Sequence, residues 1–228
     1  AIGTRPVDLH LFALKKLGAK IKIKDGYIIA EAMKGLKGAK IKFPSISVGA
    51  TENALLAAYG AEGKTILMNC AIEPEIMDLI SFLRKLGCKI KTSGRKITFI
   101  SKLLTKNKIS HQIIFDRIEA GTYLVAGALI GKKIKINKIK PKILKCEIDI
   151  LKKMGAKIFK TKNSISILKT SRLKTIKVST KAYPGFPTDL QAQLMVLLTQ
   201  ANGISKIKED IFENRFMHVP ELKRMGAK

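Results

Sequence analysis

The chain has 228 residues, 46% of them hydrophobic, which is enough to bury the core of one large domain or two modest ones and excludes a disordered chain. Its longest apolar stretch, residues 124–130, is far shorter than the roughly 20 residues that a membrane-spanning helix needs, so we expect no membrane segment. Cys70, Cys88 and Cys146 lie far apart without paired histidines. This predicts neither a disulfide framework nor a metal site, and it fits a reducing cytoplasm.

The formal net charge of +27 is typical of proteins that bind nucleic acid. Lysines, however, occur along the whole chain, as on the alternating positions Lys20, Lys22 and Lys24, and arginine supplies only 7 of the 44 basic residues. Base readout depends largely on arginine, and single-strand binding depends on aromatic residues; neither type is clustered here. We therefore predict a solvated lysine-rich surface and no nucleic-acid partner, with nucleic-acid binding as the alternative.

The first residues, AIGTRPVDLH, contain neither an initiator Met nor a signal peptide. From residue 12 onward, one segment recurs at a spacing of about seventy residues, at 12–21, 82–90, 150–158 and 221–228. The copies align without gaps at four glycines: Gly18, Gly87, Gly155 and Gly226. Each copy predicts the end of an amphipathic helix, with basic residues in its last turn and glycine after it. A hairpin should follow, with turns at Asp25-Gly26, Ser93-Gly94 and Asn163-Ser164.

A second, more apolar helix precedes three of these segments, within residues 52–63, 121–131 and 190–203. Each should close at a glycine: Gly63, Gly131 or Gly203. The fold class that we predict is therefore α+β, built from repeated αβ units of about 70 residues with one buried and one surface helix. Because residues 1–46 supply only half a unit and the last unit stops at Lys228, we expect the array to be incomplete at both ends, as a segment of a longer protein.

Several segments hold residues that the repeat does not require. They are RPVDLH (5–10), SISVGAT (45–51), EPEI (73–76), DRIEAGT (116–122), FPTDLQAQ (186–193) and FENRFMHVPEL (212–222). In this order they resemble the family of enolpyruvyl transferases that act on UDP-N-acetylglucosamine, and the likeness extends from end to end. The resemblance implies a two-domain, inside-out α/β barrel fold with three units per domain and the active site in the cleft between the domains. It places residues 1–114 in the latter part of one domain and residues 115–228 at the start of the returning half of the other.

The resemblance also implies an activity. That activity is transfer of the enolpyruvyl group from phosphoenolpyruvate to the 3′-hydroxyl of UDP-N-acetylglucosamine, the first committed step of peptidoglycan synthesis, in the bacterial cytoplasm. It implies two small-molecule substrates, no cofactor, no metal and no membrane partner. The sequence contains no HExxH motif and no GxxxxGK[ST] loop. The alternative within the same fold is enolpyruvyl transfer to shikimate 3-phosphate.

In this family the segment that matches RPVDLH serves both substrates. Arg5 matches a residue that binds phosphoenolpyruvate. A guanidinium suits this role because it can bind phosphate or carboxylate through two parallel hydrogen bonds. The alternative is a solvated arginine near a turn. The following residues match a segment whose extended backbone offers peptide groups to uracil: Pro6, Val7, Asp8 and Leu9. Asp8 has an ordinary turn role as its alternative, and His10 is expected to be structural.

The SISVGAT segment matches the nucleotide site of the family. The substrate-binding residues implied are Ser45, Ile46, Ser47, Val48 and Gly49. They should lie at the start of a helix, where free N–H groups and the helix dipole favour an anion such as a diphosphate. Serine also caps ordinary helices, and the family often has lysine where this chain has Ser45.

The last two motifs match the sugar and the reacting centre. Asp189 would be a helix cap on its sequence position alone, but the matching aspartate contacts the sugar 3′-hydroxyl as proposed general base. A carboxylate with an ordinary pKa of about 3.9 is a weak base, so this role needs desolvation and direct contact. Ile211 matches a position beside the uridine and sugar. Arg215 matches a residue near the phosphate, with a structural ion pair as an equal alternative. Asp189 and Arg5 are thus the implied catalytic residues.

The family's catalytic Cys lies on a loop a few residues before RPVDLH. By this match it would precede Ala1, and none of the three cysteines in the chain replaces it. We therefore expect the chain alone to lack activity. Four acidic residues in the other motifs are expected to support the domains: Glu73, Glu75, Asp116 and Glu119.

Overall fold

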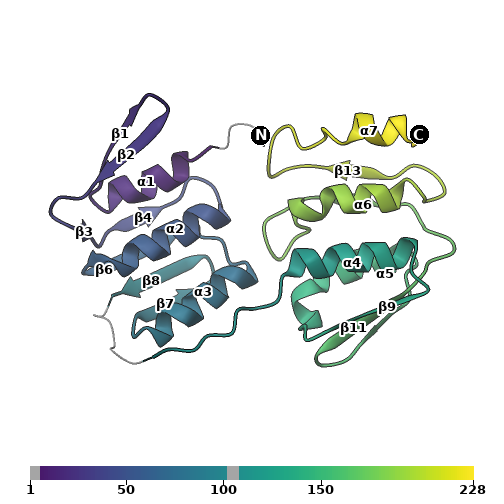
Figure 1. Ribbon diagram of the computed structural model, residues 1–228, viewed down its shortest axis with the longest axis horizontal. Coiled ribbons are helices and arrows are strands. Elements are labelled where there is room, and N and C mark those ends of the chain that lie inside the picture. Colours follow the sequence, from purple (N-terminus) through teal and green to yellow (C-terminus); the bar gives the residue numbers. More distant parts are fainter. Residues whose placement is uncertain (1–5, 102–107) are drawn as a thin grey trace. The chain divides into compact units, whose positions relative to one another are not determined.

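The computed structural model describes residues 6–101 and 108–228. The chain forms two compact units, Ala1–Ile114 and Phe115–Lys228 (Figure 1). Their assignment to two three-repeat domains stays a prediction.

The described part of the first unit contains three helices and eight strands. The helices are α1 (Asp8–Lys16), α2 (Val48–Tyr59) and α3 (Pro74–Lys85). The strands are β1 (Lys20–Lys24), β2 (Tyr27–Glu31), β3 (Leu36–Lys37), β4 (Lys40–Lys42), β5 (Ala61–Glu62), β6 (Lys64–Met68), β7 (Lys89–Ser93) and β8 (Lys96–Ile100). The main sheet has the order β4-β6-β8-β7, in which only β4 and β6 are parallel. β1 and β2 form a separate hairpin, and β3 pairs with β5 in parallel.

The two helix types of the repeat differ in burial, as the sequence predicts. Half of the residues of α2 are alanine or leucine, and it buries Ala54 and Leu55, whereas α3 is amphipathic and buries Ile76, Ile80 and Leu83 on one face. The spacing of these three residues places them on a single stripe of a helix with 3.6 residues per turn. Both helices contribute to one hydrophobic core with the inward-facing side chains of the sheet. Each fully buried aliphatic side chain stabilises the unit by about 1.5–3 kcal/mol.

The second unit repeats this plan. Its helices are α4 (Arg117–Leu129), α5 (Lys145–Lys153), α6 (Gln191–Leu198) and α7 (Val219–Arg224), with short 3-10 turns η1 (Pro141–Leu144) and η2 (Thr188–Leu190). Its strands are β9 (Lys133–Asn137), β10 (Ile158–Lys160), β11 (Ser164–Leu168), β12 (Lys177–Ser179) and β13 (Lys206–Lys208). β10-β11-β9 is antiparallel and β12 pairs with β13 in parallel. α4 packs against α6 and η2 (Figure 1), and Gly121 permits the approach of η2, since a Cβ there would lie 2.4 Å from Leu190 Cδ1.

The strand pairings confirm the predicted α+β repeat. β9-β11-β10 reproduces the antiparallel set β6-β8-β7, and β12–α6–β13 reproduces the parallel crossover β4–α2–β6. At the four aligned glycines φ is between 94° and 100°. The N–H after each glycine donates to the carbonyl five residues earlier, at 2.9–3.1 Å. Four copies of this Schellman motif therefore end four equivalent helices.

The predicted ends of the buried helices are wrong by a few residues. α2 ends at Tyr59, four residues before Gly63, because Gly60 caps it and the chain then enters β5. α4 ends at Leu129 and α6 at Leu198, also before the glycines Gly131 and Gly203. None of the helices within residues 6–101 and 108–228 is long and apolar enough to cross a membrane.

The left-handed conformation at the helix ends predicts the effect of adding a methyl group. Gly18 has φ 100° with open space around its missing Cβ, so Gly18→Ala should lower the free energy of unfolding by about 1 kcal/mol through backbone strain alone. Gly60 ends the next helix at φ −88°, with its nearest Cβ neighbour 3.8 Å away. Gly60→Ala should therefore change stability by less than about 0.5 kcal/mol. Urea unfolding followed by circular dichroism measures both, and equal losses would contradict this account.

Candidate functional site

The RPVDLH segment differs from the extended backbone that the resemblance implies. Arg5 lies outside the described residues. Helix α1 begins at Asp8, and the Leu11 N–H donates to the Val7 carbonyl at 3.0 Å, so Asp8 and Leu9 are helical. The Asp8 carboxylate suits this first turn because it interacts favourably with the helix dipole. The prediction of an extended backbone from Pro6 to Leu9 is therefore wrong at Asp8 and Leu9, and Val7, the N-cap of α1, has a ψ of 10°. The first N–H groups of the helix still lack partners within it and remain available as donors.

The SISVGAT segment begins helix α2 as predicted. Ser47 is the N-cap, and its Oγ accepts a hydrogen bond from the Ala50 N–H at 3.2 Å. The N–H groups of Val48 and Gly49, the first two of the helix, have no acceptor within it. Ser45 is exposed, while Ile46 is half-buried and packs into the core. The donors that this helix start itself offers to an anion are its backbone N–H groups and the serine hydroxyl.

His10 brings the two motifs of the first unit together. A Cβ at Gly49 would lie 3.2 Å from the His10 ring, so the imidazole lies directly on the first turn of α2. α1 and α2 also pack against each other. His10 thus has the structural role expected for it, and it places the start of α1 beside the start of α2. This is a juxtaposition that the separation in sequence does not reveal.

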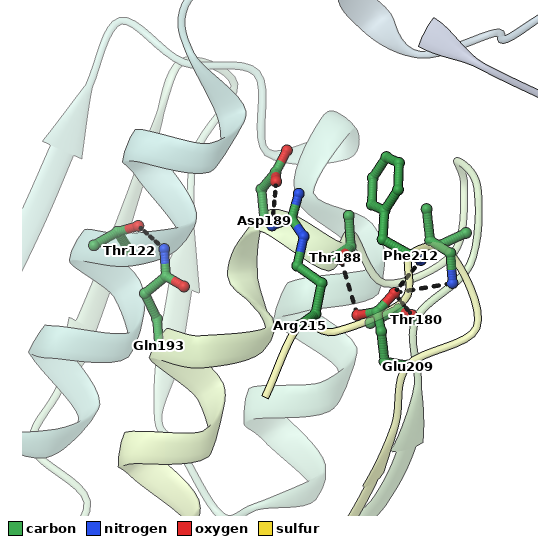
Figure 2. A network of polar contacts seen from close by, with 9 residues as sticks. Thr122, Thr180, Thr188, Asp189, Gln193, Glu209, Phe212 and Arg215 are labelled. Atoms are coloured by element: carbon green, nitrogen blue, oxygen red, sulfur yellow. Dashed lines mark hydrogen bonds and ion pairs between the residues drawn. The ribbon is translucent and has the colours of Figure 1, made fainter. Parts of the chain in front are cut away.

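In the second unit, Asp189 and Arg215 form an ion pair (Figure 2). The Arg215 guanidinium donates to Asp189 Oδ1 at 3.2 Å, and the two side chains are 37% and 58% exposed. Arg215 also lies over the ring of Phe212, 4.9 Å from its centroid. Asp189 lies in η2 and caps neither η2 nor α6, so the capping role is excluded. Arg215 thus forms an ion pair, which was one of the two alternatives for it, and its partner is the candidate base.

Glu209 is the residue that sequence reasoning misses at this site. Its carboxylate accepts hydrogen bonds from the hydroxyls of Thr180 and Thr188, each at 2.8 Å, and from the N–H groups of Ile211 at 2.9 Å and Phe212 at 3.2 Å (Figure 2). Burial alone would raise the pKa of Glu209, but these four hydrogen bonds together lower it. Glu209 is therefore ionised at neutral pH.

The location of Glu209 follows from strand register. β12 and β13 are parallel with Ser179 opposite Lys208, so Thr180 and Glu209 are the first residues beyond the carboxyl ends of neighbouring strands. Ligands of open α/β sheets bind at this edge. The signal available in the sequence is the repeat itself, which would align Glu209 with the end of β6. Ile211, which the resemblance matches to a position beside the uridine and sugar, donates its N–H to Glu209.

The cysteines and acidic residues show no alternative centre in the described part of the chain. No group of three or more His, Cys, Asp or Glu residues there could hold a metal ion. Burial raises the pKa of Cys70 to about 12 and that of Cys146 to about 11, and Cys88 is also buried. Asp116 caps α4 by accepting from the Ile118 N–H at 2.7 Å, as its structural assignment requires.

The fold is that of the enolpyruvyl transferases. The enolpyruvyl transferase NikO from Streptomyces tendae superimposes with a TM-score of 0.83 over 96% of this chain and 55% of its own, at 22% identity. EPSP synthase from Acinetobacter baumannii superimposes with a TM-score of 0.65 over 98% of this chain and 54% of its own, also at 22% identity. At this level of identity the likeness concerns the fold alone.

Sequence comparison gives the family. The model of the family EPSP synthase (3-phosphoshikimate 1-carboxyvinyltransferase) matches residues 1–228, and the chain belongs to this family. The UDP-N-acetylglucosamine 1-carboxyvinyltransferase of Pelagibacter ubique (strain HTCC1062) is 58% identical over the whole chain, which covers 55% of that protein. The protein of the same name from Endomicrobium trichonymphae is 52% identical, with 54% of its length covered. The chain thus spans about half the length of the curated relatives it matches.

The raised thiol pKa values predict slow cysteine chemistry in the folded chain. Only the thiolate reacts with a disulfide reagent, and its fraction at pH 8 falls about tenfold for each unit by which the pKa exceeds the pH. With Cys70 near 12 and Cys146 near 11, the native protein should react with Ellman's reagent more than about tenfold slower than after denaturation, when all three thiols react. One rapidly reacting native thiol would contradict this. Cys146→Ser would then show whether that thiol is the half-buried one.

Proposed function

We propose that the protein containing this chain transfers the enolpyruvyl group of phosphoenolpyruvate to the 3′-hydroxyl of UDP-N-acetylglucosamine. This would be the first committed step of peptidoglycan synthesis, in the bacterial cytoplasm. The names of relatives at 58% and 52% identity support this acceptor. The observation that carries the proposal is the Asp189–Arg215 pair, at the carboxyl edge of a parallel strand pair in a fold of enolpyruvyl transferases.

The pair would supply two of the groups that the reaction needs. Asp189 accepts the proton of the 3′-hydroxyl as the hydroxyl oxygen bonds to C2 of phosphoenolpyruvate. C3 gains a proton from an acid that this pair does not supply, the role that the resemblance gives to the family's catalytic Cys. A base then removes a proton from C3 while the C2–O bond to phosphate breaks and phosphate leaves with the bonding electrons, which restores the double bond. Arg215, and Arg5 from the first unit, would bind the phosphate and carboxylate of phosphoenolpyruvate through the planar guanidinium. Exclusion of water at Asp189 would make its carboxylate a stronger base.

The first unit would supply the nucleotide contacts. The N–H groups of Val48 and Gly49, and the hydroxyl of Ser47, suit the negative charge of the diphosphate, because a helix N-terminus concentrates unpaired donors and positive dipole charge. Ser45 and Ile46 would flank it. The uridine contacts would come from Pro6, Val7, Asp8 and Leu9, in the loop and first helical turn beside this helix start.

Ligand protection tests the acceptor. UDP-N-acetylglucosamine should raise the thermal unfolding midpoint of the chain, since a ligand at 100 times its Kd stabilises the folded state by about 2.7 kcal/mol. Shikimate 3-phosphate should have no effect, and neither single-stranded nor duplex DNA should be retarded in a gel at low salt. Protection by shikimate 3-phosphate instead would replace the acceptor, while salt-sensitive retardation of DNA would favour the nucleic-acid alternative.

Substitution of Asp189 tests the proposed base. Asp189→Asn keeps the shape of the side chain and removes its basicity, so kcat for phosphate release in the full-length protein should fall about 10²–10⁴-fold, with a much smaller change in the KM for UDP-N-acetylglucosamine. Asp149→Asn is a matched control, because Asp149 is also an exposed carboxylate paired with a basic side chain, Lys145, in the same unit. Asp149→Asn should leave kcat unchanged, and equal effects at both positions would refute the assignment.

A further inference from the structure

The carboxylate of Glu209 joins two segments that carry the candidate site. Oε2 accepts from the Thr188 hydroxyl, next to Asp189 in η2. Oε1 accepts from the N–H groups of Ile211 and Phe212, in the turn that leads to Arg215. The Thr180 hydroxyl also donates to Oε1, and its oxygen accepts from the Asp210 N–H at 2.9 Å. One half-buried side chain thus fixes the backbone on both sides of the Asp189–Arg215 contact.

The first unit provides an internal comparison for this arrangement. In the parallel pair β4–β6, Lys42 lies opposite Met68, so Phe43 and Asn69 occupy the positions of Thr180 and Glu209. The backbone bond is the same in both: Phe43 N–H to Met68 O at 3.0 Å, and Thr180 N–H to Lys208 O at 2.9 Å. The Asn69 side chain, however, makes one hydrogen bond to the described residues, from its Nδ2 to the Phe43 carbonyl at 3.0 Å.

This contrast separates what the fold requires from what is added in the second unit. A single amide contact is enough to join the two loops of the first crossover. Glu209 makes four contacts, and three of them go to residues other than its neighbour on the adjacent strand end, Thr180. These three are Thr188, Ile211 and Phe212. Hydrogen bonds to an ionised group are about twice as strong as neutral ones. The additional bonds therefore hold the elements that present Asp189 and Arg215.

We propose that Glu209 is a positioning residue for the reaction. It makes no contact with substrate, and it holds η2 and the 211–212 turn so that the Asp189 carboxylate and the Arg215 guanidinium keep their mutual geometry. For the role of the pair, this inference rests on the proposed function. The hydrogen bonds by which Glu209 holds η2 and the 211–212 turn, here called the tether, do not depend on any substrate. Reacting groups need to be held within about 0.5 Å, and a misplacement of about 1 Å can cost 10²-fold in rate.

Three substitutions separate the parts of this role. Glu209→Ala removes all four bonds. Glu209→Gln retains them, because its carbonyl oxygen can replace Oε1 and its amide can donate to Thr188 Oγ1, a hydroxyl that can also accept. Thr188→Val removes only the link to η2 at nearly constant volume. Glu213→Ala is the matched control, since Glu213 is an exposed carboxylate in the same turn that makes no hydrogen bond or ion pair with the described residues.

The first readout is amide hydrogen exchange in this chain without substrate, under conditions where circular dichroism shows each variant to be folded. Exchange at Ile211 and Phe212 should become at least about tenfold faster in Glu209→Ala. It should be unchanged in Glu209→Gln, Thr188→Val and Glu213→Ala. Unchanged exchange in Glu209→Ala would overturn the tether.

The second readout is kcat and KM in the full-length protein. Glu209→Ala and Thr188→Val should lower kcat about 10–100-fold with less than about fivefold change in the KM for UDP-N-acetylglucosamine, while Glu209→Gln and Glu213→Ala stay within about threefold of the natural protein. Loss of activity in Glu209→Gln equal to that in Glu209→Ala, or full activity in Glu209→Ala, would overturn the positioning role. If Glu209→Ala does not fold, kcat in Thr188→Val tests the positioning role, and full activity in that variant would overturn it. Absence of turnover in the unsubstituted protein would refute the proposed function, and the exchange result would still decide the tether.

Discussion

The parallel pairing of two strands across a buried helix is the constraint on which both candidate sites depend. In β4–α2–β6 and in β12–α6–β13, the parallel ladder fixes two carboxyl strand ends side by side. The loop after the first strand must then enter the helix at this same edge, so the helix start and the end of the second strand meet there. Ser47 and Asp189 both lie at such helix starts. Neither position needs a special local sequence to reach this edge, because the crossover determines it.

The two crossovers, β4–α2–β6 and β12–α6–β13, share this geometry but differ in the polar groups at their helix starts. The first opens a full helix with a serine cap and two free N–H groups, an arrangement suited to an anion. The second enters α6 through a 3-10 turn without a side-chain cap, which leaves the Asp189 carboxylate on the surface instead of bonded to its own helix. Glu209 replaces the cap as the group that fixes this turn, through Thr188. The hydrogen bond between Glu209 and Thr188 thus serves in place of a side-chain cap, and the Asp189 carboxylate can contact Arg215.

The sequence predicts those features that depend on local signals. The four glycines give the helix ends because each one needs a left-handed conformation, and the contrast between α2 and α3 follows from composition and periodicity. The start of α1 at Asp8 was not predicted, because the likeness to an extended segment outweighed the first-turn preference of Asp8. Glu209 was not predicted either. Its four partners lie on three segments that only the β12–β13 register brings together, and no local pattern in a single sequence encodes that register.

The Asp189–Arg215 ion pair is weaker than the hydrogen bonds of Glu209 that fix the backbone around it. An ion pair as exposed as that of Asp189 and Arg215 contributes at most about 1 kcal/mol, so it adds little to the stability of the unit. The hydrogen bonds of Glu209 are charge-assisted, and each contributes more than a neutral one. The backbone around the site is therefore fixed by Glu209 and not by the pair itself. A ligand that offers a hydroxyl to Asp189 and an anionic group to Arg215 needs to overcome only the weak contact, and the surrounding turn remains in place while the two side chains exchange partners.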